Sequence, residues 1–412
     1  MTAYQATHPD RDSCQSGSST SPKPSQFQST ALPAPDPGVE REHSVKDFTI
    51  RDATPADNRQ LIELAAECSM VGDISMRIDR GPDFFALNRL EGQRWRVGVA
   101  ERGGTIVGCV AISERLAFVN GRKSRTGYVG DLKVHPAHRD TRIADELSRY
   151  AERACAQLPQ TAPVMITVLA GNRAMERRLS GPRGVPVLRR IGTIRTHSIP
   201  ILWRRRVNNP GSVGVASAGW ADLDEMAALW SRVAPQRQLA PVLSASAMAD
   251  WILAAPGLDI SSYRLARSSD GELLGFLAVW DQRGFKQLNV VAYSPRMKAA
   301  RSAFNLFAPI VGGERMPPTG SPLNCVSIAH ICVPADTPQV LRAMVISAYN
   351  EVRGSGCSFM NLGLDRLDPL AAAMDGLFAQ PTDVNAYIVT TRGGVVPEYL
   401  DERPLHYEIA LV

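Results

Sequence analysis

The sequence lacks several patterns that would fix a class of protein at once. Its longest apolar runs are the length of a strand, and none approaches the roughly 20 residues that span a bilayer. The N-terminus has no basic segment followed by an apolar core, so we expect no secretory signal. The seven cysteines show neither CxxC nor ligand-like spacing, which predicts reduced thiols and a cytoplasmic protein.

Common catalytic motifs are missing as well. No His, Cys or Asp cluster has the spacing of a metal site, so we expect no metal. There is no Gly-x-Ser-x-Gly elbow and no Gly-x-x-x-x-Gly-Lys phosphate loop. What is present is ordinary for a globular protein: 412 residues, 44% hydrophobic and 21% charged, enough for two or three domains with their own cores.

Positive charge is concentrated in one stretch. The net charge is +5, and between Arg173 and Arg206 there are ten arginines, no lysine and a single acid, Glu176. Such a stretch is typical of a nucleic-acid patch, a solvated face or a contact to a phosphorylated cofactor. Only Trp203 offers a ring for base stacking, so we expect no nucleic-acid partner.

Four segments can be separated along the chain. Residues 1–45 are rich in Ser, Pro, Gln and Thr, and this composition predicts a disordered tail. A first folded unit covers 46–206, a linker with Asn-Asn-Pro-Gly covers 207–213, and a second unit covers 214–412. In the first unit, Thr54 followed by Pro55 predicts a capped helix, and Gly103-Gly104 predicts a tight hairpin turn.

The most informative stretch of the chain begins at Tyr128. The pattern predicts a strand from Tyr128 to Val134, a Pro-containing turn, a basic loop, and an amphipathic helix to about Ala156. The free backbone N–H groups at the start of such a helix form an anion site. A strand at 164–169, a helix from Asn172, and two strands at 187–191 and 196–203 are expected to close the unit.

The basic loop carries a family resemblance. Arg139-Asp-Thr-Arg-Ile-Ala144 resembles the Gln/Arg-x-x-Gly-x-Gly/Ala signature of the GNAT acyl-CoA N-acyltransferase superfamily, with Arg142 in place of the central glycine. The predicted order of helices and strands over residues 48–206 also resembles that family. The resemblance implies an α/β (α+β) fold in which helices flank a mixed central sheet.

The second unit weakly repeats the first. Tyr263 to Ala278 is similar to Val97 to Ala111, and Ser327-Ile-Ala-His-Ile-Cys-Val-Pro is similar to the stretch from Tyr128. We therefore predict tandem GNAT-like folds, with an insert at 282–320 in the second that contains a helix from Met297 to Phe307. The second copy is degenerate for CoA: Asp336 would oppose a phosphate and Pro338 lacks a backbone donor.

The resemblance also implies a cofactor site. Acetyl-CoA or another acyl-CoA would lie between the strands at 128–134 and 164–169, with pantetheine amides on one strand edge and the pyrophosphate on the following loop. The expected cofactor-binding residues are Leu132, Lys133, Val134, Arg139, Asp140, Thr141, Arg142, Ile143, Ala144 and Asn172.

Transfer to an amine requires a base and an oxyanion donor. Asp131 is the candidate base, because burial in an apolar strand would raise its pKa; the alternative is a solvated or strand-capping aspartate. The N–H of Leu132 or Lys133 would face the thioester carbonyl. In the family a tyrosine usually serves as the general acid for the leaving thiolate, and Leu179 occupies its position here. In the second copy, His330 corresponds to Asp131.

These residues predict an acyl-CoA-dependent N-acyltransferase, with acetyl the expected group. Its acceptor would be the amine of a small molecule or of a peptide, and no membrane partner is expected. Two alternatives stay open: a non-catalytic tandem protein that binds CoA or a metabolite, and a transferase that uses aminoacyl-tRNA as donor. Fold alone does not decide among them.

Overall fold

The computed structural model describes residues 30–31, 47–139, 142–180, 188–206, 213–389 and 399–412. Most of the predicted tail and of the predicted linker lies outside these ranges. No helix in them is long and apolar enough to cross a bilayer. The helices are α1 (Asn58–Glu67), α2 (Ala86–Glu91), α3 (Ile143–Cys155), α4 (Arg173–Ser180), α5 (Leu223–Val233), α6 (Ala245–Ala254), α7 (Pro295–Phe307) and α8 (Pro338–Val352).

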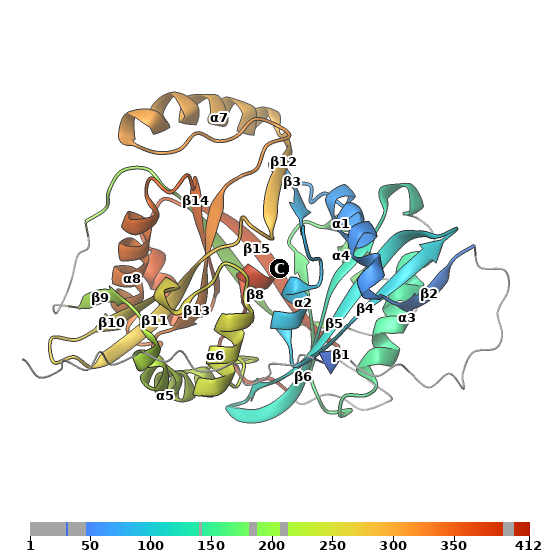
Figure 1. Cartoon of the computed structure of the whole chain (residues 1–412), viewed down its shortest axis with the longest axis horizontal. Coiled ribbons are helices and arrows are strands. Elements are labelled where there is room, and N and C mark those ends of the chain that lie inside the picture. Colours follow the sequence, from blue (N-terminus) through green and yellow to red (C-terminus); the bar gives the residue numbers. More distant parts are fainter. Residues whose placement is uncertain (1–29, 32–46, 140–141, 181–187, 207–212, 390–398) are drawn as a thin grey trace, which may run out of the picture.

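The described strands form one large mixed sheet and a two-stranded ribbon (Figure 1). The large sheet runs β1-β4-β5-β6-β7-β15-β8-β14-β13-β11-β10-β9, with β2 on β4, and the ribbon pairs β12 with β3. The strands are β1 (Thr30–Ala31), β2 (Thr49–Asp52), β3 (Ile74–Asp79), β4 (Arg94–Arg102), β5 (Thr105–Val119), β6 (Arg122–Val134), β7 (Val164–Leu169), β8 (Leu188–Pro200), β9 (Gly214–Ser217), β10 (Tyr263–Arg267), β11 (Leu273–Asp281), β12 (Gln287–Tyr293), β13 (Cys325–Cys332), β14 (Phe359–Asp365) and β15 (Gln380–Val389).

The sheet confirms the α/β class, with helices packed against it in both halves (Figure 1). Local predictions also hold. Gly103 and Gly104 have φ of 58° and 81° in the turn between β4 and β5, as a tight hairpin requires. Helix α3 ends at Cys155, within one residue of the predicted end.

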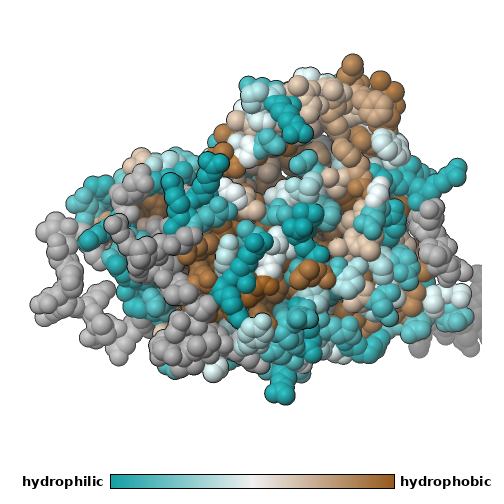
Figure 2. All heavy atoms as spheres, turned by 180° about the vertical axis from the view of Figure 1, so that it is seen from behind, coloured by the Kyte–Doolittle hydropathy of each residue, from teal (hydrophilic) through white to brown (hydrophobic). Residues whose placement is uncertain are grey.

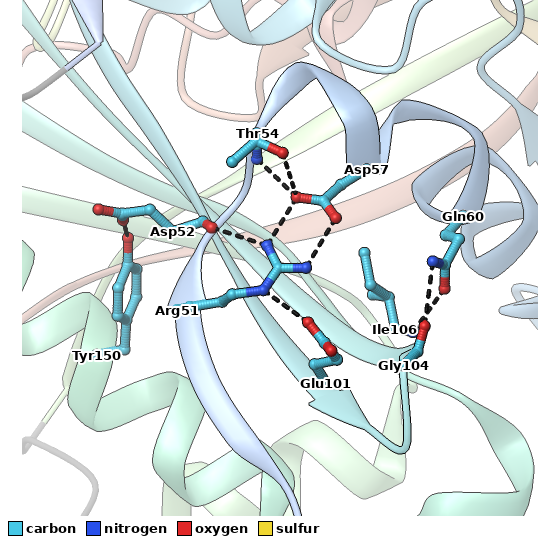
Figure 3. Close-up of polar contacts among 9 residues, drawn as sticks. All are labelled: Arg51, Asp52, Thr54, Asp57, Gln60, Glu101, Gly104, Ile106 and Tyr150. Atoms are coloured by element: carbon cyan, nitrogen blue, oxygen red, sulfur yellow. Dashed lines mark hydrogen bonds and ion pairs between the residues drawn. The ribbon is translucent and has the colours of Figure 1, made fainter.

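The start of the first unit is fixed by a compact polar network (Figure 3). Thr54 and Asp57 form the predicted cap, with the Thr54 N–H donating to Asp57 Oδ2 at 2.7 Å. The Arg51 guanidinium donates to both oxygens of Asp57 and to Glu101, so it joins β2, the helix start and β4. This guanidinium lowers the pKa of Asp57 to about 2, so the pair is charged throughout the neutral range.

The two halves exchange strands where they meet. The sequence predicts two strands at 187–191 and 196–203 that close the first unit; the structure has instead the single strand β8. Strand β8 pairs with β14 and β15, and β15 pairs in turn with β7. Each half therefore completes its sheet with a strand from the other half, and the sheet is continuous across the molecule.

A second link between the halves was not predicted. Strand β3 precedes α2, and strand β12 lies inside the insert at 282–320; the two pair antiparallel from Gln287↔Asp79 to Tyr293↔Ile74. Helix α7 packs over this ribbon through Met297 and Phe304. The predicted helix in the insert is thus confirmed, while its partner strands were missed.

The last residues of the chain run between the halves. Gln238 N–H donates to Pro404 O, and Leu405 N–H donates to Asp365 Oδ2 at 2.8 Å. Ile409, in the short helix η9 (Ile409–Leu411), lies directly against the backbone of Gly363 in β14. We call residues 404–412 the C-terminal segment.

Packing of this segment on β14 gives a first prediction. A Cβ atom at position 363 would overlap Cγ2 of Ile409, so Gly363→Ala should lower the free energy of unfolding by about 1–3 kcal/mol, measured by urea denaturation. In an Ile409→Ala background the same change should have little effect. Gly284→Ala, where no atom lies within 4 Å of the new Cβ, is the matched control. Equal losses of stability in Gly363→Ala and Gly284→Ala would contradict the close packing of Ile409 on Gly363.

Candidate active site

The first half contains an opening between two parallel strands. Strands β6 and β7 pair at Gly127↔Val164, Tyr128↔Met165 and Val129↔Ile166, and the ladder ends there. Both strands continue, to Val134 and Leu169, without further pairing to one another. This opening, which we call the β6–β7 opening, therefore presents strand edges whose backbone groups face no partner strand.

Several predicted cofactor residues lie along this opening. Leu132 and Val134 are partly buried against the core beneath α3, and Lys133 lies between them on β6. The exposed Arg139 follows the turn at Pro136–His138, with its Nε 3.5 Å from Val134 O. Arg142 precedes α3, and Ile143 and Ala144 form its first turn, while Asp140 and Thr141 lie outside the described residues.

Asn172 lies at the same end of the opening, after β7. Its N–H donates to Leu169 O at 3.1 Å, and its Oδ1 accepts from Met175 N–H at 3.2 Å. It therefore caps the N-terminus of α4. The structure thus brings the end of β6, the start of α3 and the start of α4 to one edge of the sheet, where the carboxyl ends of both parallel strands meet.

The equivalent opening in the second half is filled. Strands β13 and β14 pair only from Cys325↔Phe359 to Ser327↔Asn361. Beyond that point Glu408 accepts the His330 N–H through both carboxylate oxygens, at 3.0 and 3.2 Å, and Ile409 lies on Gly363. The C-terminal segment therefore occupies the position that corresponds to the β6–β7 opening.

The two halves share one backbone feature at this position. Asp131 has φ of 51° and His330 has φ of 49°, and each lies opposite an irregularity in the neighbouring ladder. A β-bulge of this kind turns the backbone out of the ladder. The two residues that the sequence comparison aligns therefore share a backbone conformation.

The expected increase in the pKa of Asp131 is wrong. Burial raises this pKa, but the Lys133 ammonium and the Arg80 guanidinium, whose Nη1 lies 2.8 Å from Oδ2, outweigh burial and hold it well below its usual range. The sequence suggested a carboxylate in an apolar strand because Arg80 is 51 residues away. Asp131 as the base stays a prediction, but a carboxylate with a lowered pKa accepts protons poorly.

Arg80 connects the bulge in β6 to α2. Its Nη2 donates to Phe84 O at 2.6 Å and lies 3.4 Å from Asn88 Oδ1. Glu91 is three residues after Asn88 and therefore on the same face of α2. Burial raises the pKa of Glu91 to about 8, and the nearby Arg115 charge lowers it only in part.

The second half supplies further groups to this region. Lys286, which precedes β12, acts electrostatically on Glu91 and donates to Ala410 O at 3.1 Å; burial lowers its pKa to about 8. Tyr407 OH lies 3.0 Å from Thr167 Oγ1, which is 2.8 Å from Tyr128 OH. Burial raises the pKa of Tyr407 to about 12, so the phenol is neutral. We call Glu91, Arg115, Lys286, Tyr128 and Tyr407 the junction cluster.

No signal in the sequence indicates the junction cluster. Its members come from α2, β5, β6, the loop before β12 and the C-terminal segment, and no local spacing relates them. His330, by contrast, lies buried among aromatic rings. Its ring lies 4.1 Å from that of Trp251, its Nδ1 is 2.7 Å from Tyr263 OH, and burial lowers its pKa to about 4. Among the described residues no three His, Cys, Asp or Glu could hold a metal ion.

Comparison with known proteins agrees with this architecture. Residues 59–178 match the model of the acetyltransferase (GNAT) family. Saccharomyces cerevisiae N-myristoyltransferase, solved with myristoyl-CoA, superposes with a TM-score of 0.59 at 12% identity over 89% of this chain and 90% of its own. A GCN5-related N-acetyltransferase from Sphaerobacter thermophilus gives 0.53 at 13% identity, over 85% and 98%. No curated protein sequence matches the chain.

The Arg80–Asp131–Lys133 ion pairs give a second prediction. Asp131→Asn leaves a buried guanidinium without its counter-charge, so the free energy of unfolding at pH 7 should fall by about 3 kcal/mol. Because the folded-state pKa is lowered, this contribution is present above the unfolded pKa of about 4 and is lost as the pH falls towards the folded value.

The difference between wild type and Asp131→Asn should therefore shrink between about pH 4 and pH 2, measured by urea denaturation at several pH values. Glu63→Gln, which removes an exposed pair with Arg59, should change stability by less than about 0.5 kcal/mol. A pH-independent difference would show that the loss at position 131 is not electrostatic.

Proposed function

We propose that this chain is an acyl-CoA N-acyltransferase and that it binds its donor in the first half alone. The match of residues 59–178 to the acetyltransferase (GNAT) family supports the activity. The observation that carries the proposal is the contrast between the two openings. The β6–β7 opening has unpaired strand edges beside a helix N-terminus, whereas Glu408 and Ile409 occupy its counterpart. One acyl-CoA per chain follows from this contrast.

The donor fits the β6–β7 opening by its chemistry. Pantetheine amides can pair with the backbone of Leu132 to Val134, as an added strand would. The pyrophosphate suits the start of α3, where free N–H groups and the helix dipole favour negative charge, and Arg139 adds a cation. The donor is acetyl-CoA or another acyl-CoA. The myristoyl-CoA bound to the similar yeast structure supports a thioester of this class.

The thioester carbonyl would lie at the bulge in β6. In the second half the corresponding N–H, that of His330, already donates to the Glu408 carboxylate. The bulge geometry is therefore suited to direct an amide towards a negatively charged oxygen. By this internal correspondence the Asp131 N–H, rather than that of Leu132 or Lys133, is the donor for the oxyanion.

Glu91 is better suited than Asp131 to act as the base. Near pH 8 about half of a carboxylate with a pKa of about 8 is ionised, so it can take a proton from the acceptor's ammonium group. The free amine then attacks the thioester carbon, the oxyanion forms at the bulge, and the C–S bond breaks. The thiolate leaves and takes up the proton that the attacking nitrogen loses, so that the amide and the CoA thiol are released, and Glu91 returns its proton to solvent.

The acceptor amine would enter between the halves. Glu91 belongs to the first half, while Lys286 and Tyr407 reach the same region from the second. An amine of a small molecule or of a peptide suits this arrangement, because the base and the thioester are approached from the junction. The second half thus shapes the acceptor site instead of binding a second cofactor.

Titration calorimetry with CoA should give a stoichiometry of one per chain. Arg139→Glu should weaken binding at least tenfold, because it replaces a phosphate-binding cation with a negative charge. Arg122→Glu, at an exposed position at the opposite end of β6, is the matched control and should bind as wild type does. Two CoA molecules per chain, or none, would contradict the assignment of the opening.

The base is tested by the pH dependence of turnover. With acetyl-CoA and a panel of amines, wild-type kcat/KM should rise with pH through a pKa of about 8, because only ionised Glu91 accepts the proton. Glu91→Gln should lower kcat by about 10² to 10⁴, leave CoA affinity unchanged and abolish that limb. If the limb persists in Glu91→Gln and disappears in Asp131→Asn, Asp131 is the base. Binding without thioester cleavage for any amine would favour a non-catalytic protein.

A further inference from the structure

Helix α7 and the 3-10 turn η7 (Ala308–Val311) form an arm that projects from the second half (Figure 1). Ser294 caps the helix, since its Oγ accepts the Met297 N–H at 3.2 Å. The inner face packs on the β3–β12 ribbon through Met297 and Phe304. None of the residues of α7 itself is fully buried, so the helix is covered on one side only.

The outer face of this arm is apolar. Leu306 and Ile310 are each 78% exposed and Phe307 is 49% exposed. Ala299 and Ala303 precede them at helical spacing and are exposed as well. Figure 2 shows apolar side chains gathered at the end of this arm. Scattered apolar residues are normal on a protein surface, but a contiguous apolar face on one helix indicates an interaction site.

An exposed tryptophan continues this face. The turn after η7 lies against the end of β8, since a Cβ at Gly313 would be 2.7 Å from Leu202 Cδ2 and 2.9 Å from Ile201 O. The next residue, Trp203, is 45% exposed. The arm and the segment 203–206 are therefore adjacent, although about 100 residues separate them in sequence.

The surroundings of this face are basic. From Gln282 to Ala335 the only acid is Glu314, against six cations. Three of the six are exposed on or beside the arm: Arg296, Lys298 and Arg315. Arg204 and Arg206, the end of the arginine-rich stretch noted in the sequence, are exposed next to Trp203. Apolar side chains are thus bordered by five exposed cations, against two exposed acids, Glu314 and Asp73, whose Oδ1 accepts from the Ser294 hydroxyl at 2.9 Å.

We propose that the outer face of α7 and η7, together with residues 203–206, docks on an anionic lipid surface. Leu306, Phe307 and Ile310 would enter the boundary between headgroups and acyl chains, with Trp203 at headgroup depth and the cations on lipid phosphates. A nucleic acid would use the arginines but not the exposed aliphatic side chains. A protein partner would need acidic groups at the rim of its own groove, whereas a bilayer of anionic lipid supplies them everywhere.

Surface docking is compatible with the lack of a spanning segment. The sequence predicts no membrane partner because it has no apolar run of sufficient length. A helix that lies in the interface needs only one apolar face and a basic border, which α7 has. The proposal concerns the intact protein and does not depend on the transferase chemistry.

Co-sedimentation of the full chain with vesicles tests this proposal. Binding is expected to phosphatidylglycerol–phosphatidylcholine vesicles, to weaken as salt is raised, and to be at least tenfold weaker with phosphatidylcholine alone. The double variant Leu306→Ser, Ile310→Ser should lose at least tenfold in vesicle affinity. Leu367→Ser, at a position that is also 78% exposed, is the matched control and should bind as wild type does.

Charge reversal separates the electrostatic contribution to vesicle binding from the apolar contribution. Arg296→Glu with Lys298→Glu should weaken binding to anionic vesicles and reduce its salt dependence, whereas Lys123→Glu, exposed at the start of β6, should not. No binding to anionic vesicles would overturn the proposal. That result would leave a protein partner as the occupant of this face. Equal binding to both vesicle types, or full binding by the Leu306→Ser, Ile310→Ser variant, would also overturn the proposal, because the lipid interaction would then not depend on anionic headgroups or on this face. Melting temperatures equal to wild type show that the variants are folded.

Discussion

The pairing of β8 with β14 and of β15 with β7 is the constraint on which the site depends. Because each half completes its sheet with a strand of the other, the halves cannot separate without breaking backbone ladders. The C-terminal segment follows β15 and is thereby delivered to the junction. There Glu408 and Ile409 occupy the opening of the second half, while Tyr407 reaches Thr167 on β7 of the first. One topological feature therefore sets both which opening stays free and which residues line the approach to it.

The bulges at Asp131 and His330 have similar backbone conformations but different partners. At φ near 50°, Asp131 and His330 hold equivalent positions. In the second half the ring of His330 packs among Tyr263 and Trp251, and its N–H holds a carboxylate from the chain itself. In the first half the Asp131 side chain is held by Arg80 and Lys133, which fixes the bulge and links it to α2. A side chain that is ion-paired in this way positions its own backbone, and in the proposed mechanism the Asp131 N–H is thereby directed at the thioester carbonyl.

Local features could be predicted from the sequence because their causes are local. The Gly103–Gly104 turn, the Thr54 cap and the strand at Val164–Leu169 each depend on neighbouring residues, and all three are found. The β3–β12 ribbon and the strand exchange depend on pairings across more than 100 residues, which no periodicity encodes. The expected direction of the Asp131 pKa shift is wrong because it considers burial alone. Lys133, two residues away, and Arg80, distant in the sequence, together lower this pKa. Glu91 was missed because a glutamate at the end of an amphipathic helix is usually solvated.

In the proposed mechanism the second half binds no cofactor, and the junction cluster gives it a part in the acceptor site. There the amine meets the thioester at the β6 bulge, on the side of the sheet that faces the second half. Lys286 lies close enough to act on Glu91; burial of each group raises the pKa of Glu91 to about 8 and lowers that of Lys286 to about 8, while the Lys286 charge lowers the pKa of Glu91 in part. The second half also packs on the helix that carries Glu91, since Trp251 of α6 donates its Nε1–H to Leu90 O at 3.0 Å. In the proposed mechanism the second half therefore contributes to the low-dielectric environment of Glu91, a residue of the first half.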